Sequence, residues 1–220
     1  MLVDNVADSS AHLNASVARA KGSAKSGMYY PRGPRSYADE VFAMSRKLHI
    51  GGHTRAAGWE ILNAQPGPHV DHVLDARNLS TFADGTFEQI YASHVVEHFD
   101  YVDELLATLS EWCRVLEPEG VLFVSVPDLD VLARLFLDRT GLSVADRYLV
   151  MRMIFGGHVD RYDYHVVGLN DEFLGGFLVN AGFVHVQRVP RFGMFNDTSE
   201  TVMNGTPISL NMVAHKPAAA

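Results

Sequence analysis

The 220-residue sequence predicts an α/β fold in which helices cover a doubly wound, mostly parallel sheet. From residue 46 onward, short apolar runs bounded by turn residues alternate with segments of helical periodicity. One run, "VLFVSVP" (121–127), is almost continuously apolar, which is typical of a central parallel strand buried on both faces. Two further strand-like runs follow the last helical segment. Together these features predict a doubly wound sheet.

Four short strands are expected in the first half of this pattern. Their sequences are rich in β-branched and aromatic residues and end at Gly, Pro, Asn or Asp. Only eight residues (53–60) separate Gly52 from Ile61, so the first connection has room for a helix of one or two turns at most. The four strands are expected at "RKLHIGG" (46–52), "WEILNA" (59–64), "HVDHVLDA" (69–76) and "FEQIYAS" (87–93).

A helix is expected next, with Asp100 as its N-cap. "EPEG" (117–120) ends this helix and leads into the fifth strand. Apolar residues recur at steps of three and four, so they should share one face. These residues are Val102, Leu105, Leu106, Leu109, Cys113 and Leu116.

The last third of the chain predicts a helical and loop insertion after the fifth strand, followed by a helix and two strands. Residues 129–155 should form two helical pieces broken near Thr140 and Gly141, and 156–168 should form a polar loop. Asn170 is the expected N-cap of the last helix, which Gly182 ends. Phe173, Leu174, Phe177 and Leu178 would form its apolar face, and "VHVQRV" (184–189) and "ISLNMVAH" (208–215) are the closing strands.

Composition narrows the range of functions. Hydrophobic residues make up 47% of the chain and charged residues 20%, as in ordinary globular domains. The net charge of -8, without basic runs, argues against binding nucleic acid or anionic membranes. The apolar runs are too short to cross a bilayer. The single cysteine, Cys113, excludes an internal disulfide.

These features favour a cytoplasmic protein that acts on a small molecule, and they leave room for a homodimer. Residues 1–45, which are rich in Ala and Ser, are expected to form a peripheral N-terminal arm. Residues 46–220 should form the functional domain.

The stretch "ASHVVEHFD" (92–100) contains H-x-x-E-H, formed by His94, Glu97 and His98. This spacing occurs in zinc peptidases, where the motif lies inside a helix. Here it follows a predicted strand, and no third protein ligand is apparent in the sequence. A zinc-dependent hydrolase is therefore the weaker alternative, and no metal is expected.

The residues around this stretch indicate a different class of protein. The strand follows a D-x-x-F turn and leads into S-x-x-x-E-H, a helix, R-V-L-x-P-x-G and another strand. The residues concerned are Asp84, Phe87, Ser93, Glu97, His98, Arg114, Val115, Leu116, Pro118 and Gly120. This pattern, over roughly residues 46–135, resembles class I S-adenosylmethionine-dependent methyltransferases, and in particular a small bacterial subgroup of the type-11 kind.

The resemblance implies a Rossmann-like, seven-stranded sheet whose last strand is antiparallel. It also implies S-adenosylmethionine as cofactor and methyl transfer to a small-molecule acceptor. By subgroup analogy, that acceptor would be a sugar or glycan precursor. In open parallel sheets, ligands bind beyond the carboxyl ends of the strands. The implied cofactor-binding residues are Gly51, Gly52, His53, Asn63, Asp75, Ala76, Ser93 and His94.

Two positions depart from the family pattern. His53 replaces the third residue of a G-C-G turn, which should restrict positive φ and crowd the cofactor. Asn63 replaces a carboxylate that accepts hydrogen bonds from the ribose hydroxyls, so charge assistance is lost. These departures keep open a second alternative, a non-catalytic methyltransferase-like binding or scaffold protein.

The loop at 156–168 is the strongest candidate for binding the acceptor. It carries histidine, aspartate and tyrosine side chains in close sequence, within a candidate substrate lid at 128–170. His165 is the first choice for a general base, because an ordinary imidazole titrates near neutral pH. Tyr164 is expected to hydrogen-bond the acceptor, and His94 is the third candidate catalytic residue.

Overall fold

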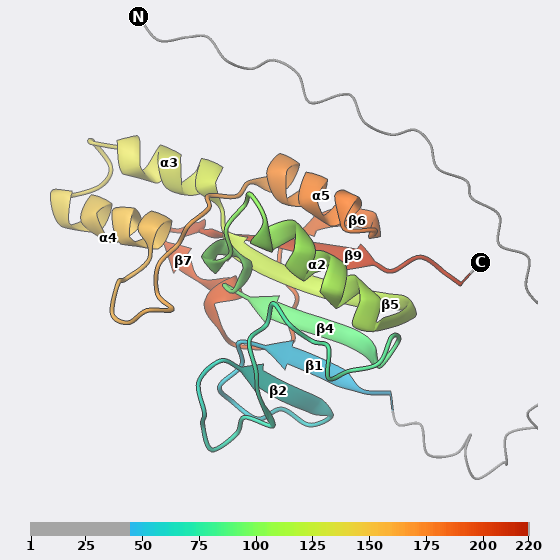
Figure 1. The fold of residues 1–220 in the computed structure, drawn as a ribbon. Helices are drawn as coiled ribbons and strands as arrows, with labels where there is room; N and C mark the ends of the chain where they lie inside the picture. The colour runs from blue at the N-terminus through green and yellow to red at the C-terminus, as the bar shows by residue number, and fades with distance from the viewer. Residues whose placement is uncertain (1–44, 220) are drawn as a thin grey trace, which may run out of the picture. The chain divides into compact units, whose positions relative to one another are not determined.

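The structure is a computed structural model that describes residues 45–219. The predicted arm at 1–45 therefore lies outside the described residues, except for Ser45. Within the described part, strands form one seven-stranded sheet in the order β3-β2-β1-β4-β5-β9-β6 (Figure 1). The strands are β1 Lys47–Ile50, β2 Trp59–Asn63, β3 His72–Val73, β4 Phe87–Ser93, β5 Leu116–Pro127, β6 Val184–Val189 and β9 Ser209–His215.

The topology confirms the predicted sheet. Strands β1 to β5 pair in parallel, whereas β9 lies antiparallel between β5 and β6. Residue pairs such as Leu48 with Ile90 and Ile90 with Leu122 place their side chains on one face. Helices α2 (Glu104–Val115) and α5 (Asp171–Asn180) pack over that face (Figure 1). This layer holds the main apolar core.

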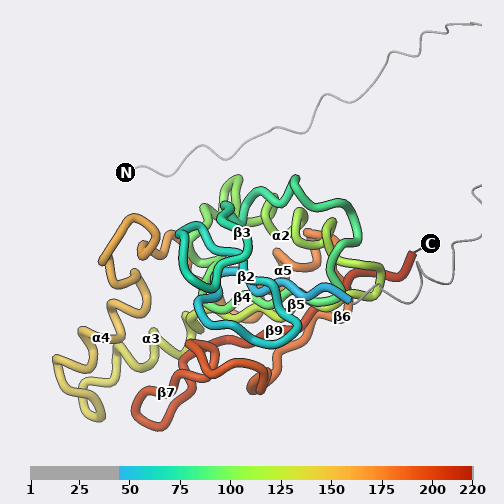
Figure 2. Tube along the Cα trace, turned by 90° about the horizontal axis from the view of Figure 1, so that it is seen from below, coloured from blue at the N-terminus to red at the C-terminus, as the bar shows by residue number. Residues whose placement is uncertain are grey.

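Helices α3 (Leu129–Leu137) and α4 (Val144–Phe155) form a pair beyond the end of β5 (Figure 2). The break between them at 138–143 confirms the predicted interruption near Thr140 and Gly141. Ser143 caps α4 through a capping box with Asp146. The pair has its own small core, made of Val131, Leu132, Leu142, Val150 and Ile208.

The start of α2 corrects the sequence prediction. Asp100 is not the N-cap, because the helix begins at Glu104 after Asp103. Instead, the Asp100 carboxylate accepts a hydrogen bond from the Val102 amide and holds a turn before the helix. Val102 is 77% exposed and Leu106 39% exposed, so neither belongs to the buried face.

Two other predictions also fail locally. The first connection, at residues 51–58, is a loop without helix, which lies within the predicted limit of two turns. Strand β3 keeps only two of the expected residues, because the Asp71 carboxylate accepts from the Ile61 amide and fixes a turn before it. Leu116 lies in β5 and Phe173 is exposed, so neither joins the helical face assigned to it.

The other face of the sheet is covered in part by a segment to which the sequence analysis assigned no structure. Residues 190–207 contain the short turn η2 (Thr198–Glu200) and the hairpin of β7 (Val202–Met203) with β8 (Thr206–Pro207). Phe195 packs against His49 and Tyr91 at ring-centroid distances of 4.4 and 4.5 Å. None of the helices in residues 45–219 is both long and apolar enough to cross a membrane.

Candidate functional site

A cavity of about 670 Å³ lies at the carboxyl ends of β1, β2 and β4. This is the edge where open parallel sheets bind ligands, and the volume suits a small-molecule site. The sheet ends and the loop at 161–166 contribute to the same cavity. Its lining comprises Ile50, Gly51, His53, Leu62, Asn63, Ala64, Gln65, Asp75, Ala76, Arg77, His94, Val95, His98, Phe99, Arg161, Tyr162, Tyr164 and Val166.

The turn after β1 needs its two glycines. Gly51 has φ +79°, and a Cβ there would lie 2.7 Å from Val95 Cγ2. A Cβ on Gly52 would lie 2.8 Å from the His49 ring. His53, by contrast, has no positive φ, so the expected strain at the third position is absent. It lines the cavity without distorting the turn.

Asn63 links the two loops that border this cavity. Its Nδ2 donates to the Gly52 carbonyl at 3.2 Å, and its Oδ1 accepts from the Gln65 amide at 2.9 Å. The side chain is buried. A carboxylate could not donate to the Gly52 carbonyl, so the amide has a structural reason to be here.

The loop after β3 brings Asp75, Ala76 and Arg77 to the cavity wall. Asp75 pairs with Arg77 at 2.6 Å, and Arg77 also pairs with Glu104 at the start of α2. The guanidinium holds the pKa of the Asp75 carboxyl below its usual range. Asp75 is therefore ionised at neutral pH.

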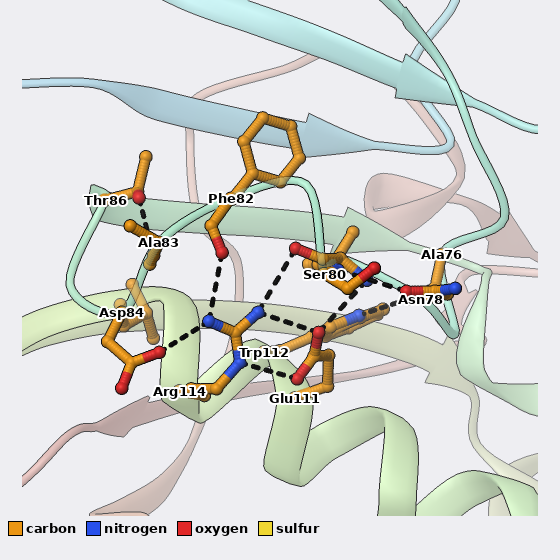
Figure 3. A network of polar contacts seen from close by, with 12 residues as sticks. Ala76, Asn78, Ser80, Phe82, Ala83, Asp84, Thr86, Glu111, Trp112 and Arg114 are labelled. Carbon is orange, nitrogen blue, oxygen red and sulfur yellow. Dashed lines mark hydrogen bonds and ion pairs between the residues drawn. The ribbon is translucent and has the colours of Figure 1, made fainter.

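Helix α2 fixes this loop from below (Figure 3). The Trp112 Nε1 donates to the Ala76 carbonyl at 2.8 Å, and the Arg114 guanidinium donates to the carbonyls of Leu79 and Phe82. Arg114 also pairs with Asp84 and Glu111. Two of the residues that define the family pattern, Asp84 and Arg114, thus support the cavity wall without touching the cavity.

At the end of β4 the candidate residues divide between two spaces. Ser93 Oγ hydrogen-bonds Thr198 Oγ1 and lines a second cavity, of about 660 Å³, on the side of residues 195–198. His94, with φ +54°, borders both cavities. Gly51 and His53 are also shared, so the two spaces adjoin at the β1 turn. Ser93 was predicted to bind the cofactor together with His94, but it is not part of the lining of the 670 Å³ cavity.

The loop at 156–168 folds over the H-x-x-E-H stretch. The amides of Val166 and Val167 donate to the Glu97 carbonyl at 2.9 and 3.4 Å. Tyr164 lines the cavity and stacks on His158 at a centroid distance of 4.0 Å. His165 turns inward, with Nε2 3.9 Å from Glu97 Oε1, and it does not line the cavity.

Burial is the largest cause of the pKa shifts of the side chains beneath this loop. Desolvation raises the pKa of Glu97 to about 8 and lowers the pKa of His94 to about 4. The pKa of His165 is also lowered, first by burial and then by nearby His98. Both imidazoles, His94 and His165, are therefore neutral at pH 7.

Several lining residues had no signal in the sequence. Gln65, Arg77 and Phe99 lie beside assigned positions but in ordinary loop contexts. Arg161 and Tyr162 belong to the predicted lid, yet were not singled out. Asp197, which accepts from the Tyr91 hydroxyl at 2.8 Å, lies in the segment that had no assigned structure.

Comparison with known proteins agrees with this geometry. A methyltransferase domain family matches residues 56–124, from the turn before β2 into β5. No curated protein matches the chain. A S-adenosylmethionine-dependent methyltransferase structure from Archaeoglobus fulgidus has a TM-score of 0.51 at 17% identity, over 83% of this chain and 90% of the other.

Two further structures show how length varies among these matches. A "possible exported protein" of Bordetella parapertussis gives a TM-score of 0.50 at 12% identity, over 82% of this chain and 65% of the other. For the CurJ carbon methyltransferase (TM-score 0.46, 18% identity), 79% of this chain is covered but only 49% of the other, so the chain spans about half its length. At these identities the structural likeness concerns the fold alone.

The family match carries the assignment, and the sheet topology agrees with it. The predicted fold is confirmed. Residues 56–124 match the methyltransferase domain family, and the described residues have the fold of S-adenosylmethionine-dependent methyltransferases.

Proposed function

We propose that this chain transfers a methyl group from S-adenosylmethionine to a hydroxyl-bearing small molecule of the sugar or glycan-precursor class. One observation carries the proposal. A single cavity joins the residues expected to hold the cofactor to the loop expected to hold the acceptor.

The cofactor half of the cavity fits its proposed ligand. Gly51 and Gly52 leave backbone exposed where any Cβ would collide with a neighbour, which suits close approach of the methionine part. Asn63 and Asp75 would face the ribose and adenine, and Ala76 and His53 would complete this wall. The cofactor, when bound, supplies an electrophilic methyl carbon on its sulfonium.

The acceptor half is polar and comes from a different part of the chain. Arg161, Tyr162 and Tyr164 come from the loop at 156–168 and line the same cavity as His94 and His98. Hydroxyls and imidazoles at a cavity wall can orient the hydroxyl groups of a sugar. Methyl transfer needs this alignment and the exclusion of water more than covalent participation by the protein.

The three candidate catalytic residues differ in their distance from the cavity, so their proposed roles differ. His94 and Tyr164 line the cavity and would contact the acceptor directly. His165 is held behind them against Glu97, so it would position the wall or accept a proton through its neighbours. The position of Ser93 favours a role at the second cavity, next to Thr198.

The test is methyl transfer from S-adenosylmethionine labelled in its methyl group to a panel of free sugars, sugar phosphates and nucleotide sugars. Label transferred to at least one sugar, and transferred roughly tenfold more slowly by Tyr164→Phe, supports the proposal. An amine and a thiol without hydroxyl groups complete the panel, and transfer to these alone would overturn the acceptor class. Cofactor binding without any transfer would instead favour the non-catalytic binding protein.

A further inference from the structure

Glu97 is a buried acid without a hydrogen-bond partner among residues 45–219. Its side chain is 1% exposed, and neither Oε1 nor Oε2 takes part in a hydrogen bond. The ionised form of such a side chain is costly unless a cation or several donors stabilise it. The fold nevertheless places it at the centre of a polar cluster, next to the cavity.

Three histidines surround this carboxylate. His94 Nδ1 lies 3.6 Å and His165 Nε2 3.9 Å from Glu97 Oε1. The nearest ligand atoms of Glu97, His98 and His165 all lie within 4.8 Å of one another. The His98 and His165 rings meet edge to face at 4.9 Å. The fold thus brings His165 beside the H-x-x-E-H stretch, from which it is distant in sequence.

The hydrogen bonds around the cluster point lone pairs toward its centre. The Ser209 hydroxyl donates to the Thr198 carbonyl, so it can only accept from His94 Nε2, 2.9 Å away. His94 Nδ1 is then unprotonated where it faces Glu97. Likewise, His98 Nδ1 must donate to the Tyr164 carbonyl at 3.0 Å, which leaves its Nε2 as an acceptor.

We propose that Glu97, His98 and His165 bind a divalent transition-metal ion, with His94 beside them. Two imidazoles and a carboxylate are ligands for such ions at sites that keep open positions. The Tyr164 carbonyl orients His98 from behind, as outer partners of metal-bound histidines do. Ligand atoms of one ion lie about 3–3.5 Å apart, so binding draws the three side chains together.

The ion would border the cavity, because His94 and His98 both line it. Its open positions would bind a hydroxyl oxygen of the acceptor and lower the pKa of that hydroxyl. This role rests on the proposed methyl transfer, whereas binding of the ion does not.

The test is titration of the full chain, stripped with chelator, by Co²⁺, followed by visible absorption and then by competition with Zn²⁺. We expect about one ion per chain and a Co²⁺ ligand-field spectrum. Glu97→Gln, His98→Ala and His165→Ala should each weaken binding at least about tenfold. His69→Ala, at an exposed histidine outside both cavities, is the matched control and should bind as wild type does.

Circular dichroism and binding of S-adenosylhomocysteine separate the other outcomes. Variants that fold and bind S-adenosylhomocysteine yet lose Co²⁺ support the site. Wild-type protein without a stoichiometric ion, or variants that retain it in all three cases, would overturn the site and leave methyl transfer standing. Metal binding without cofactor binding would overturn the proposed function alone.

Discussion

Replacing Asp75 tests the proposed cofactor site most directly at the residue scale. Asp75 lines the cavity and carries a negative charge at pH 7, stabilised by Arg77. If Asp75 contacts the cofactor as proposed, Asp75→Ala removes one charge-assisted hydrogen bond, and binding of S-adenosylhomocysteine should weaken roughly tenfold or more. Isothermal titration calorimetry measures this change.

Asp84→Ala is the matched control for that variant. It also removes the partner of an arginine, Arg114, but Asp84 does not line the cavity. Its affinity for S-adenosylhomocysteine should stay within about twofold of wild type. Equal losses in the two variants would show that Asp75 acts only through folding of the loop.

Glu60 provides a pH-dependent contribution to stability at the residue scale. Hydrogen bonds from Arg46 lower the pKa of Glu60 to about 2, with a further contribution from His72. The folded pKa lies below the unfolded one, so the stabilisation is present above about pH 4.5 and is lost as the pH falls toward 2. Because Arg46 is 43% exposed, solvent screening reduces the effect.

Glu60→Gln should therefore lower the free energy of unfolding by about 1 kcal/mol at pH 7. The difference from wild type should shrink toward zero as the pH approaches 2. Urea denaturation at several pH values measures both. Glu88 on β4 has no ion-pair partner among residues 45–219, so Glu88→Gln should show no such trend. A constant difference at all pH values would contradict the assignment to the ion pair.

At the scale of elements, helix α2 and the loop at 74–86 act as one unit. Arg114 holds two loop carbonyls and two carboxylates at once. Arg114→Lys keeps the charge but loses the planar fork, so the free energy of unfolding should fall by about 1.5–3 kcal/mol. Hydrogen exchange in residues 74–86 should also become faster.

Arg134→Lys on α3 is the control for this variant. Arg134 is exposed and makes no ion pair among the described residues, so its replacement should change stability by less than about 0.5 kcal/mol. If Arg114→Lys were equally silent, the network in Figure 3 would have no role in holding the cavity wall.

A separate prediction concerns the loop at 156–168. Tyr164→Phe keeps the stacking on His158 but removes the hydroxyl from the cavity wall. Affinity for S-adenosylhomocysteine and the melting temperature should stay unchanged, whereas turnover should drop roughly tenfold. Tyr148→Phe on the exposed side of α4 is the control. Unchanged turnover in both variants would place the acceptor away from this loop.

Local patterns in the sequence predicted elements well where they coincide with burial. The apolar run of β5 and the spacing of Leu105 and Leu109 on α2 each led to the correct element. Residues 190–207 gave no periodic signal, because Phe195 is fixed by packing on His49 and Tyr91. Such packing depends on tertiary contacts that no local window contains.

The site shows the same division. Glycines at the β1 turn and the acid at Asp75 could be placed because strand ends converge at one edge of a parallel sheet. The contact between the loop at 156–168 and the H-x-x-E-H stretch could not be predicted, because His98 and Tyr164 are 66 residues apart in sequence. Whether the predicted residues bind cofactor and acceptor stays a prediction.

At the scale of the described domain, the residues proposed to bind cofactor and acceptor lie at one edge of the sheet. The turn after β1, the loop after β3 and the lid converge on one cavity, while α2 and α5 stabilise the face behind it. The central claim is that this cavity binds the cofactor.

Calorimetric titration of the wild-type chain with S-adenosylhomocysteine tests that claim most directly. The account predicts one site per chain with a dissociation constant below about 1 mM, a range that calorimetry resolves. It also predicts that the signal weakens in Asp75→Ala and persists in Asp84→Ala. Absence of binding to folded wild-type protein at millimolar ligand would contradict the claim.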